Sequence, residues 1–186
     1  MKKFLSDLSR FFREPIVRFL FFGFGLYLIW LALYEWWIHP AGWMDNAVIN
    51  STIYLSTVIL EWTGYLVQHS EARVMGIQGT SGIFIGDSCN GISLFALYSI
   101  FLIAFPGKIL SKIIFIPAGI VIIYLLNVLR IVCLSVIETY SYEWTEFNHT
   151  YTFTILIYIF IFTTWLVWIN KFSGISEKRI VTKNSK

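Results

Sequence analysis

Long apolar segments alternate with polar stretches along most of this chain. Four of them, residues 16–38, 88–105, 113–137 and 151–169, consist mainly of aliphatic and aromatic side chains. Their lengths are close to the roughly 20 residues that a helix needs to cross the hydrocarbon core of a membrane. The pattern therefore predicts an all-α membrane protein with about four transmembrane helices.

A fifth apolar stretch, residues 47–67, differs from these four because polar residues recur in it at helical spacing. The apolar stripe comprises Val48, Leu55, Ile59, Trp62 and Leu66, and the polar stripe comprises Asn50, Thr57, Glu61, Gly64 and Gln68. A helix with two such stripes suits a membrane surface better than the bilayer interior. We expect an amphipathic surface helix at 47–67, on the outer side of the membrane.

Residues 73–86 have a different periodicity, with two short runs of β type on either side of the sequence Gly-Thr-Ser-Gly at 79–82. Glycine and serine in this arrangement are typical of a tight turn. We expect a small β-hairpin that leads the chain to Cys89. No other segment of the sequence predicts a strand.

The composition agrees with a membrane protein, because 57% of the residues are hydrophobic and only 13% are charged. Such values exclude a typical soluble domain. Twelve of the 14 lysines and arginines fall in residues 1–18, at Lys108 and Lys112, or after Ile169. Since basic residues are retained on the cytoplasmic side, both termini are predicted to be cytoplasmic.

The N-terminal residues resemble the charged start of a signal peptide. The apolar stretch that follows is long and ends in Tyr34-Glu35-Trp36-Trp37, which is not a small-residue cleavage site. We therefore interpret residues 16–38 as a retained anchor. Residues 1–172 are expected to form a single integral-membrane domain, with a polar cytoplasmic tail at 173–186.

Three polar residues lie where this topology brings separate segments to the outer side of the membrane. Cys89 opens the second apolar segment, Arg130 lies near the outer end of the third, and His149 precedes the fourth. An arginine inside a spanning helix indicates a functional site by default. The alternative is a structural role, in which Arg130 reaches the headgroups or pairs with one of the nearby glutamates, Glu138, Glu143 or Glu146.

Cys89 also allows two interpretations. A cysteine reacts as its thiolate, from an ordinary pKa of about 8.5, and a nearby cation, base or helix N-terminus favours that form. Arg130, His149 and the start of the second helix could supply all three, and the glycines at 86 and 91 would leave space for a substrate. The alternatives without catalysis are an inert buried thiol or a disulfide with Cys133.

Two further histidines compete with His149 for the role of base. His39 follows two tryptophans and precedes Pro40, which indicates a position in the interfacial aromatic belt. His69 lies at the end of the predicted surface helix and is the stronger alternative to His149 as the base.

Three motifs in order along the chain resemble those of the exosortase/archaeosortase family of integral-membrane cysteine transpeptidases, in particular its short, Bacteroidetes-like bacterial members. The motifs are Cys89-Asn90-Gly91-Ile92, Asn127-Val128-Leu129-Arg130-Ile131, and His149 ahead of the last span. The resemblance implies catalytic roles for Cys89, Arg130 and His149 and supporting roles for Asn127, Asn90 and Gly91, without a metal or cofactor. Asn90 replaces the commoner serine, and the chain is shorter than many members.

The resemblance also implies a substrate and a place of action. Members of the family are thought to cleave exported proteins near a C-terminal sorting signal, made of a short motif, a transmembrane helix and a basic cluster. They act at the outer face of the bacterial cytoplasmic membrane and transfer the product to a surface acceptor. Membrane lipid is the other expected partner, and no nucleic acid is expected.

Other functions fit the residues less well. A non-enzymatic assembly or scaffold protein with a structural Cys89–Cys133 pair is the main alternative. A transporter would need polar residues through the depth of the bilayer, whereas here they gather at one side. A thiol redox protein would normally contain a Cys-x-x-Cys pair, which the sequence lacks.

Overall fold

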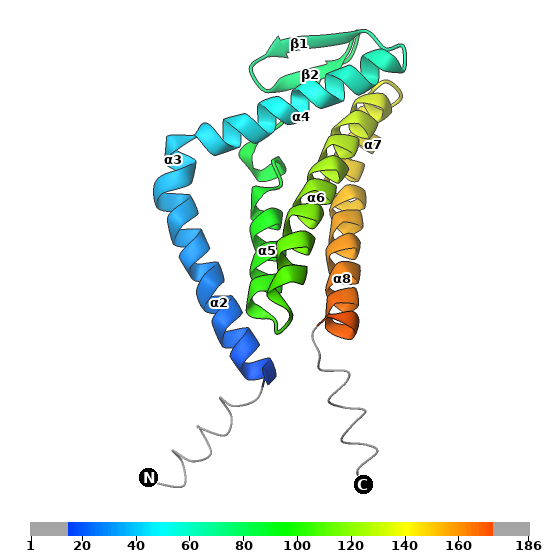
Figure 1. Cartoon of the computed structure of the whole chain (residues 1–186). Helices are drawn as coiled ribbons and strands as arrows, with labels where there is room; N and C mark the ends of the chain where they lie inside the picture. The colour runs from blue at the N-terminus through cyan, green and yellow to red at the C-terminus, as the bar shows by residue number, and fades with distance from the viewer. Residues whose placement is uncertain (1–14, 173–186) are drawn as a thin grey trace, which may run out of the picture.

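The computed structural model describes residues 15–172; the basic N-terminal residues and the predicted tail at 173–186 lie outside the described part. Helices form a bundle, and one small sheet lies at one end of it (Figure 1). In chain order the elements are α2 (Pro15–Leu33), the π-helix η1 (Tyr34–Ile38), α3 (His39–Ala41), α4 (Trp43–Trp62), β1 (Val67–Glu71), β2 (Val74–Ile77), β3 (Ile83–Phe84), the 3₁₀ turn η2 (Asp87–Cys89), α5 (Ile92–Ala104), α6 (Ile109–Glu138), α7 (Tyr142–Phe147), the π-helix η3 (Asn148–Thr152) and α8 (Phe153–Lys171).

The described chain has three helical segments long and apolar enough to cross a membrane. They are Val17–Ala41, Ile109–Glu138 and Phe153–Lys171. The apolar helix α5 has only 13 residues, or about 20 Å at 1.5 Å per residue, against a hydrocarbon core of about 30 Å. The prediction of a mainly helical chain with membrane-length helices is confirmed, whereas the count of four spans is not.

The helix ends differ from those of the predicted segments. The segment predicted to start at residue 88 becomes helical only at Ile92, because Gly91 adopts a left-handed conformation, with φ of 81°, as the N-cap. The first segment continues through η1 and α3 until Gly42, with φ of 66°, ends it. At the other end of the chain, α7 and η3 lead into α8 without a break, so the last helical segment starts well before residue 151.

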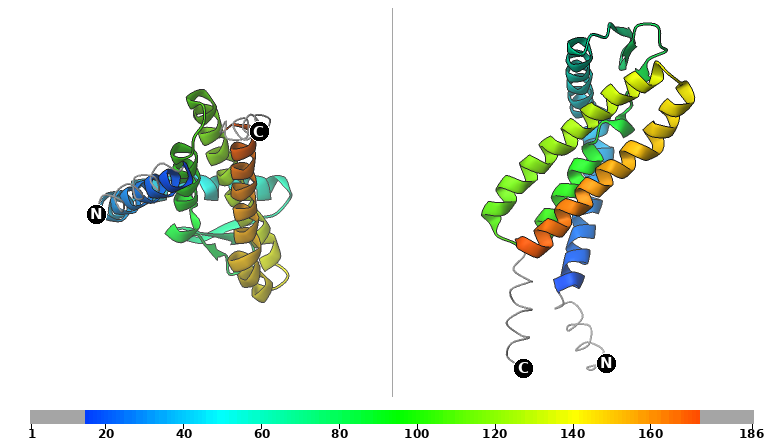
Figure 2. Two further views of the ribbon diagram at one scale, coloured as in Figure 1. Left: turned by 90° about the horizontal axis from the view of Figure 1, so that it is seen from below. Right: turned by 90° about the vertical axis from the view of Figure 1, so that its right-hand side faces the viewer.

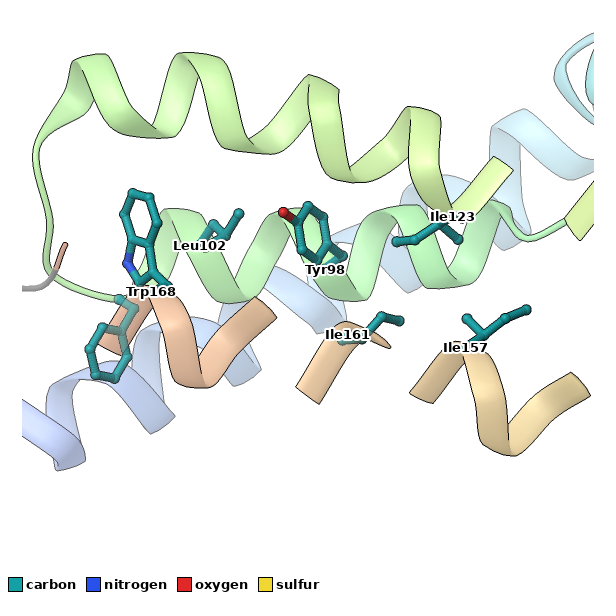
Figure 3. Close-up of a cluster of buried hydrophobic side chains, with 7 residues drawn as sticks. Tyr98, Leu102, Ile123, Ile157, Ile161 and Trp168 are labelled. Atoms are coloured by element: carbon teal, nitrogen blue, oxygen red, sulfur yellow. The ribbon is translucent and has the colours of Figure 1, made fainter. Parts of the chain in front are cut away.

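Helices α5, α6 and α8 pack around a common core of large side chains (Figure 3). Figure 2 shows α6 and α8 running side by side in opposite directions, joined through α7. Helix α2 packs on α5 and diverges from the other helices towards α4. The buried core residues are Tyr98, Leu102, Phe105, Ile123, Ile157, Ile161 and Trp168.

Helix α4 crosses the end of the bundle and packs against α6 (Figure 1). Its buried face is largely polar and is formed by Asp45, Ile49, Thr52, Ser56 and Leu60. Two residues of the predicted apolar stripe are instead largely exposed: Trp62 is 88% and Leu66 is 70% exposed. Helix α4 therefore packs on α6 through a face that contains small hydroxyl side chains, which let two helices approach closely.

The predicted end of this helix at residue 67 was wrong. The helix ends at Trp62, and Gly64 with φ of 92° turns the chain into β1. Strands β1, β2 and β3 form an antiparallel sheet in that order. The β2–β3 hairpin around residues 79–82 was predicted, but β1 was not. Its sequence, Val-Gln-His-Ser-Glu, is mostly polar, so pairing with β2 determines its strand structure.

The sheet is anchored to the helices by a second apolar core. Met75, Ile77 and Ile85 from the sheet region pack with Ile49 and Leu60 of α4 and with Ile131 of α6. This core fixes the segment that leaves β3, and η2 follows directly. We call this end of the bundle, which carries α4 and the sheet, the sheet end. Figure 1 shows that the α5–α6 turn and the C-terminal end of α8 lie at the opposite end.

Replacement of Gly119 by alanine is expected to destabilise the helical core. A Cβ atom at this position would lie 2.2 Å from the ring of Tyr98, whose hydroxyl donates a hydrogen bond of 2.9 Å to the carbonyl of Phe115. Overpacking of this kind typically costs about 1–3 kcal/mol. Thermal unfolding in detergent would measure the loss.

Gly25→Ala is the matched control, because nothing lies within 4 Å of a Cβ at this helical glycine. Its stability should be unchanged or raised by up to about 1 kcal/mol, through the better helix propensity of alanine. Equal melting temperatures for Gly119→Ala and the unmodified protein would contradict the packing described above.

Candidate active site

Cys89 lies in the short turn η2, not in helix α5 as predicted. Its backbone N–H donates to the carbonyl of Gly86 at 2.9 Å, and the N–H of Asn90 donates to the carbonyl of Asp87 at 3.4 Å. Gly91 then adopts a left-handed backbone conformation, and α5 begins at Ile92. The cysteine is therefore two residues ahead of the helix cap, at the sheet end of the bundle.

The three residues predicted to be catalytic come together at this turn. The Sγ atom of Cys89 lies 3.3 Å from Nε2 of His149 and 3.9 Å from Nη2 of Arg130. The same Nη2 donates to the backbone carbonyl of His149 at 3.1 Å. The thiol comes from η2, the guanidinium from α6 and the imidazole from η3, so three elements contribute one side chain each.

The supporting residues hold the turn rather than the guanidinium. Asn127 donates from Nδ2 to the carbonyl of Cys89 at 3.0 Å. Asn90 is 2% exposed, and its Oδ1 accepts the N–H of Ile92 at 2.9 Å. A Cβ on Gly91 would make only ordinary contacts, so its positive φ, and not space for a substrate, explains the need for glycine.

Arg130 is 8% exposed and has no carboxylate partner among the described side chains. The alternative in which it pairs with Glu138 or Glu143 is therefore not what the structure contains; the side chain of Glu146 lies outside the described part. Its Nε atom is buried without a hydrogen-bond partner. Because no carboxylate of the described residues neutralises the guanidinium of Arg130, its positive charge can act on the sulfur of Cys89.

The remaining sequence candidates are placed elsewhere. No disulfide joins Cys89 to Cys133. His69 is exposed on β1, and it does not line the cavity that contains Cys89. His39 is not a simple belt residue, because its Nδ1 lies 3.4 Å from Oδ2 of Asp45 and its ring stacks on Tyr34.

A cavity of about 390 Å³ opens at Cys89 and extends between α5 and α8. A smaller cavity of about 200 Å³ lies towards β3, and His149 lines both. The imidazole can therefore be reached from two sides. The larger cavity is lined by Cys89, Ser93, Leu94, Arg130, His149, Thr154, Ile157 and Tyr158.

Within residues 15–172 no three histidine, cysteine, aspartate or glutamate side chains lie close enough together to hold a metal ion. The carboxylates near the site have other environments. Asp87 forms an ion pair of 2.8 Å with Arg73. Within the described residues, His149 forms no hydrogen bond with Asp87, Glu138 or Glu143. The site as described consists of one thiol, one imidazole and one guanidinium.

Comparison with protein families matches residues 10–167 to the transmembrane exosortase family (Exosortase_EpsH). The match covers most of the chain. This protein belongs to the transmembrane exosortase family. No curated protein and no solved structure matches the chain.

The matched residues include the three side chains of the candidate site, which come from η2, α6 and η3. One buried residue beside that site was not singled out from the sequence. Asp45 is 1% exposed, and its carboxylate accepts a hydrogen bond from the side-chain amide of Asn90. The available signal was the spacing of Asp45, Thr52 and Ser56, which places three polar side chains on one face of a helix.

Gly91→Ala is expected to lower both the stability of this exosortase and the reactivity of Cys89. A left-handed backbone conformation costs a non-glycine residue roughly 1–2 kcal/mol, and relaxing it would displace the turn that carries the thiol. Alkylation of Cys89 in a Cys133→Ser background, followed by mass spectrometry, measures the reactivity.

Gly64→Ala provides the matched control. Gly64 also has a positive φ, 92°, and nothing lies near its Cβ position, but it is at the end of α4, away from the thiol. It should cost similar stability and leave the alkylation rate of Cys89 unchanged. Equal loss of Cys89 reactivity in both variants would show that the effect is general and not specific to the turn.

Proposed function

We propose that this exosortase is a cysteine peptidase and transpeptidase in which Cys89 is the nucleophile, His149 the acid and base, and Arg130 the electrostatic stabiliser. The observation that carries the proposal is the 3.3 Å contact between Sγ of Cys89 and Nε2 of His149, with Nη2 of Arg130 3.9 Å from the same sulfur. A thiol beside a base and a cation is the arrangement that favours a reactive thiolate.

In the first half of the proposed reaction, the Cys89 thiolate attacks the carbonyl carbon of the scissile peptide bond. Negative charge then develops on the carbonyl oxygen, and the guanidinium of Arg130 stabilises it. The C–N bond breaks as His149 gives its proton to the leaving amine. The products are a thioester on Cys89, a neutral imidazole and a released C-terminal peptide.

In the second half, an amine or water attacks the thioester carbonyl and loses a proton to His149. Collapse of this intermediate breaks the C–S bond and returns the Cys89 thiolate. An amine acceptor gives transpeptidation, and water gives hydrolysis. The cavity on the β3 side of His149 leaves the imidazole accessible from a direction other than that of Cys89, which supports the entry of a second reactant.

The charge distribution supports an orientation for the proposed reaction. Lys108 lies in the α5–α6 turn and Lys171 ends α8, both at the end of the bundle opposite Cys89. Basic residues are retained on the cytoplasmic side. We therefore place the termini in the cytoplasm of a bacterial cell and the thiol at the outer face of the inner membrane.

An exported protein with a C-terminal motif, a transmembrane helix and a basic cluster would present its motif at that face. Its own helix would lie in the bilayer beside the bundle, and its basic cluster would remain in the cytoplasm. The scissile bond would then lie at the depth of Cys89. Family membership and the proposed orientation together support this substrate class as part of the proposal.

Three single substitutions test the proposed roles. Cys89→Ala should abolish processing, Arg130→Ala should reduce it by about 10²–10³-fold, and His149→Ala by about 10²–10⁴-fold. The measurement is quantitative mass spectrometry of the C-terminal peptides of exported membrane-anchored proteins, in host cells that lack the native copy and express each variant.

Cys133→Ser and His69→Ala are the matched controls, since neither side chain reaches the proposed nucleophile, and both should process substrates at the normal rate. Full processing by Cys89→Ala would refute the enzymatic proposal and leave a scaffold role. Labelling of Cys89 in intact cells by a membrane-impermeant maleimide tests the orientation, and labelling only after cell lysis would reverse it.

A further inference from the structure

Asp45, in the first turn of α4, is a carboxylate buried to 1% exposure that the proposed reaction does not use. Its Oδ1 accepts hydrogen bonds from the hydroxyl of Tyr34 at 2.7 Å and from Nδ2 of Asn90 at 2.5 Å. Its Oδ2 lies 3.4 Å from Nδ1 of His39. Three side chains, from η1, α3 and the segment after η2, thus meet at one carboxylate of α4.

Burial of this carboxylate is costly, because a buried charge loses its hydration. Arg73, the arginine of the sheet region, is already engaged, with Asp87 at 2.8 Å and with Asn46 at 2.6 Å. Among residues 15–172, the basic side chain that lies within 4 Å of Asp45 is the imidazole of His39, which is 42% exposed. An apolar side chain would fill the same space at lower cost, so filling space does not account for an aspartate.

A single side chain, that of Asn90, connects Asp45 to the turn that carries the nucleophile. Asn90 follows Cys89 directly, and both ends of its amide are occupied: Nδ2 donates to Asp45, and Oδ1 accepts the N–H of Ile92. A side chain bound at both ends cannot move without moving its backbone. The position of the Cys89 turn is therefore tied to α4 on one side and, through Asn127, to α6 on the other.

We propose that Asp45 is a positioning residue for the nucleophile. Through Asn90 it holds the Cys89 turn where Sγ meets His149 and Arg130, and through Tyr34 it ties that turn to the C-terminal end of the first membrane-length helix. The consequence for turnover rests on the proposed function, whereas the consequence for the position and reactivity of the thiol does not.

The test exchanges the two partners. Asn90→Asp places a second carboxylate against Asp45, and the repulsion in a buried site should displace the turn. Adding Asp45→Asn restores one amide and one carboxylate with their positions reversed. The single variant should lower the alkylation rate of Cys89 at neutral pH by at least about tenfold. It should also shift the pH midpoint of alkylation towards that of an ordinary thiol, about 8.5.

The double variant should recover the rate to within about threefold of the unmodified protein. Asn90→Asp combined with Asp87→Asn is the charge control: it also removes one negative charge near the turn, but from a carboxylate that pairs with Arg73 and does not face Asn90. It should not recover. Cys133, partly buried on α6, is the internal control, because general loosening would speed its alkylation in every variant.

Three outcomes would overturn the proposal: normal Cys89 reactivity in Asn90→Asp, recovery by Asp87→Asn as complete as by Asp45→Asn, or a double variant that fails to fold or to react. If Asn90→Asp alone does not fold, the double variant decides, since it must both fold and react. Failure of the proposed function would instead appear as substrate processing that survives Cys89→Ala, whatever the alkylation rates.

Discussion

The arrangement of this exosortase depends on how a bundle of apolar helices accommodates the guanidinium of Arg130. An arginine within such a helix is costly unless other groups accept its hydrogen bonds. Here the acceptor is the backbone carbonyl of His149, 3.1 Å away, and the sulfur of Cys89 lies within 3.9 Å. The contacts of this one Nη2 group therefore also bring the imidazole and the thiol together.

That solution requires irregular backbone at several points around the site. A backbone carbonyl inside a regular α-helix is already used four residues further on, so a carbonyl that accepts from Arg130 is easier to supply where the helix changes form. His149 lies in the π-helix η3 and Cys89 in the 3₁₀ turn η2. Tyr34, which bonds to Asp45, lies in the other π-helix of the described chain, η1. Single-turn π segments are frequently found at functional sites.

Contacts with helix α4 and the sheet hold these irregular segments in position. The core that joins Met75 and Ile85 to Leu60 and Ile131 fixes the entry to η2. From the same helix, the hydroxyl of Ser56 reaches the carbonyl of Val128 on α6 at 3.4 Å. The polar face of α4 thus packs on α6 while its first turn holds Asn90 through Asp45, and one helix connects the packing of the bundle to the position of the nucleophile.

The sequence by itself determined the membrane-length helices, the β2–β3 hairpin and the three residues that meet at the site. These have local causes: apolar segment length, turn chemistry, and the rarity of an arginine in an apolar helix. Only the tertiary structure decided that α5 is short, that α4 buries its polar face, that β1 pairs with β2, and that Asn127 and Asp45 hold the Cys89 turn from opposite sides. The last three of these depend on a partner distant in sequence, so no local pattern of residues could specify them.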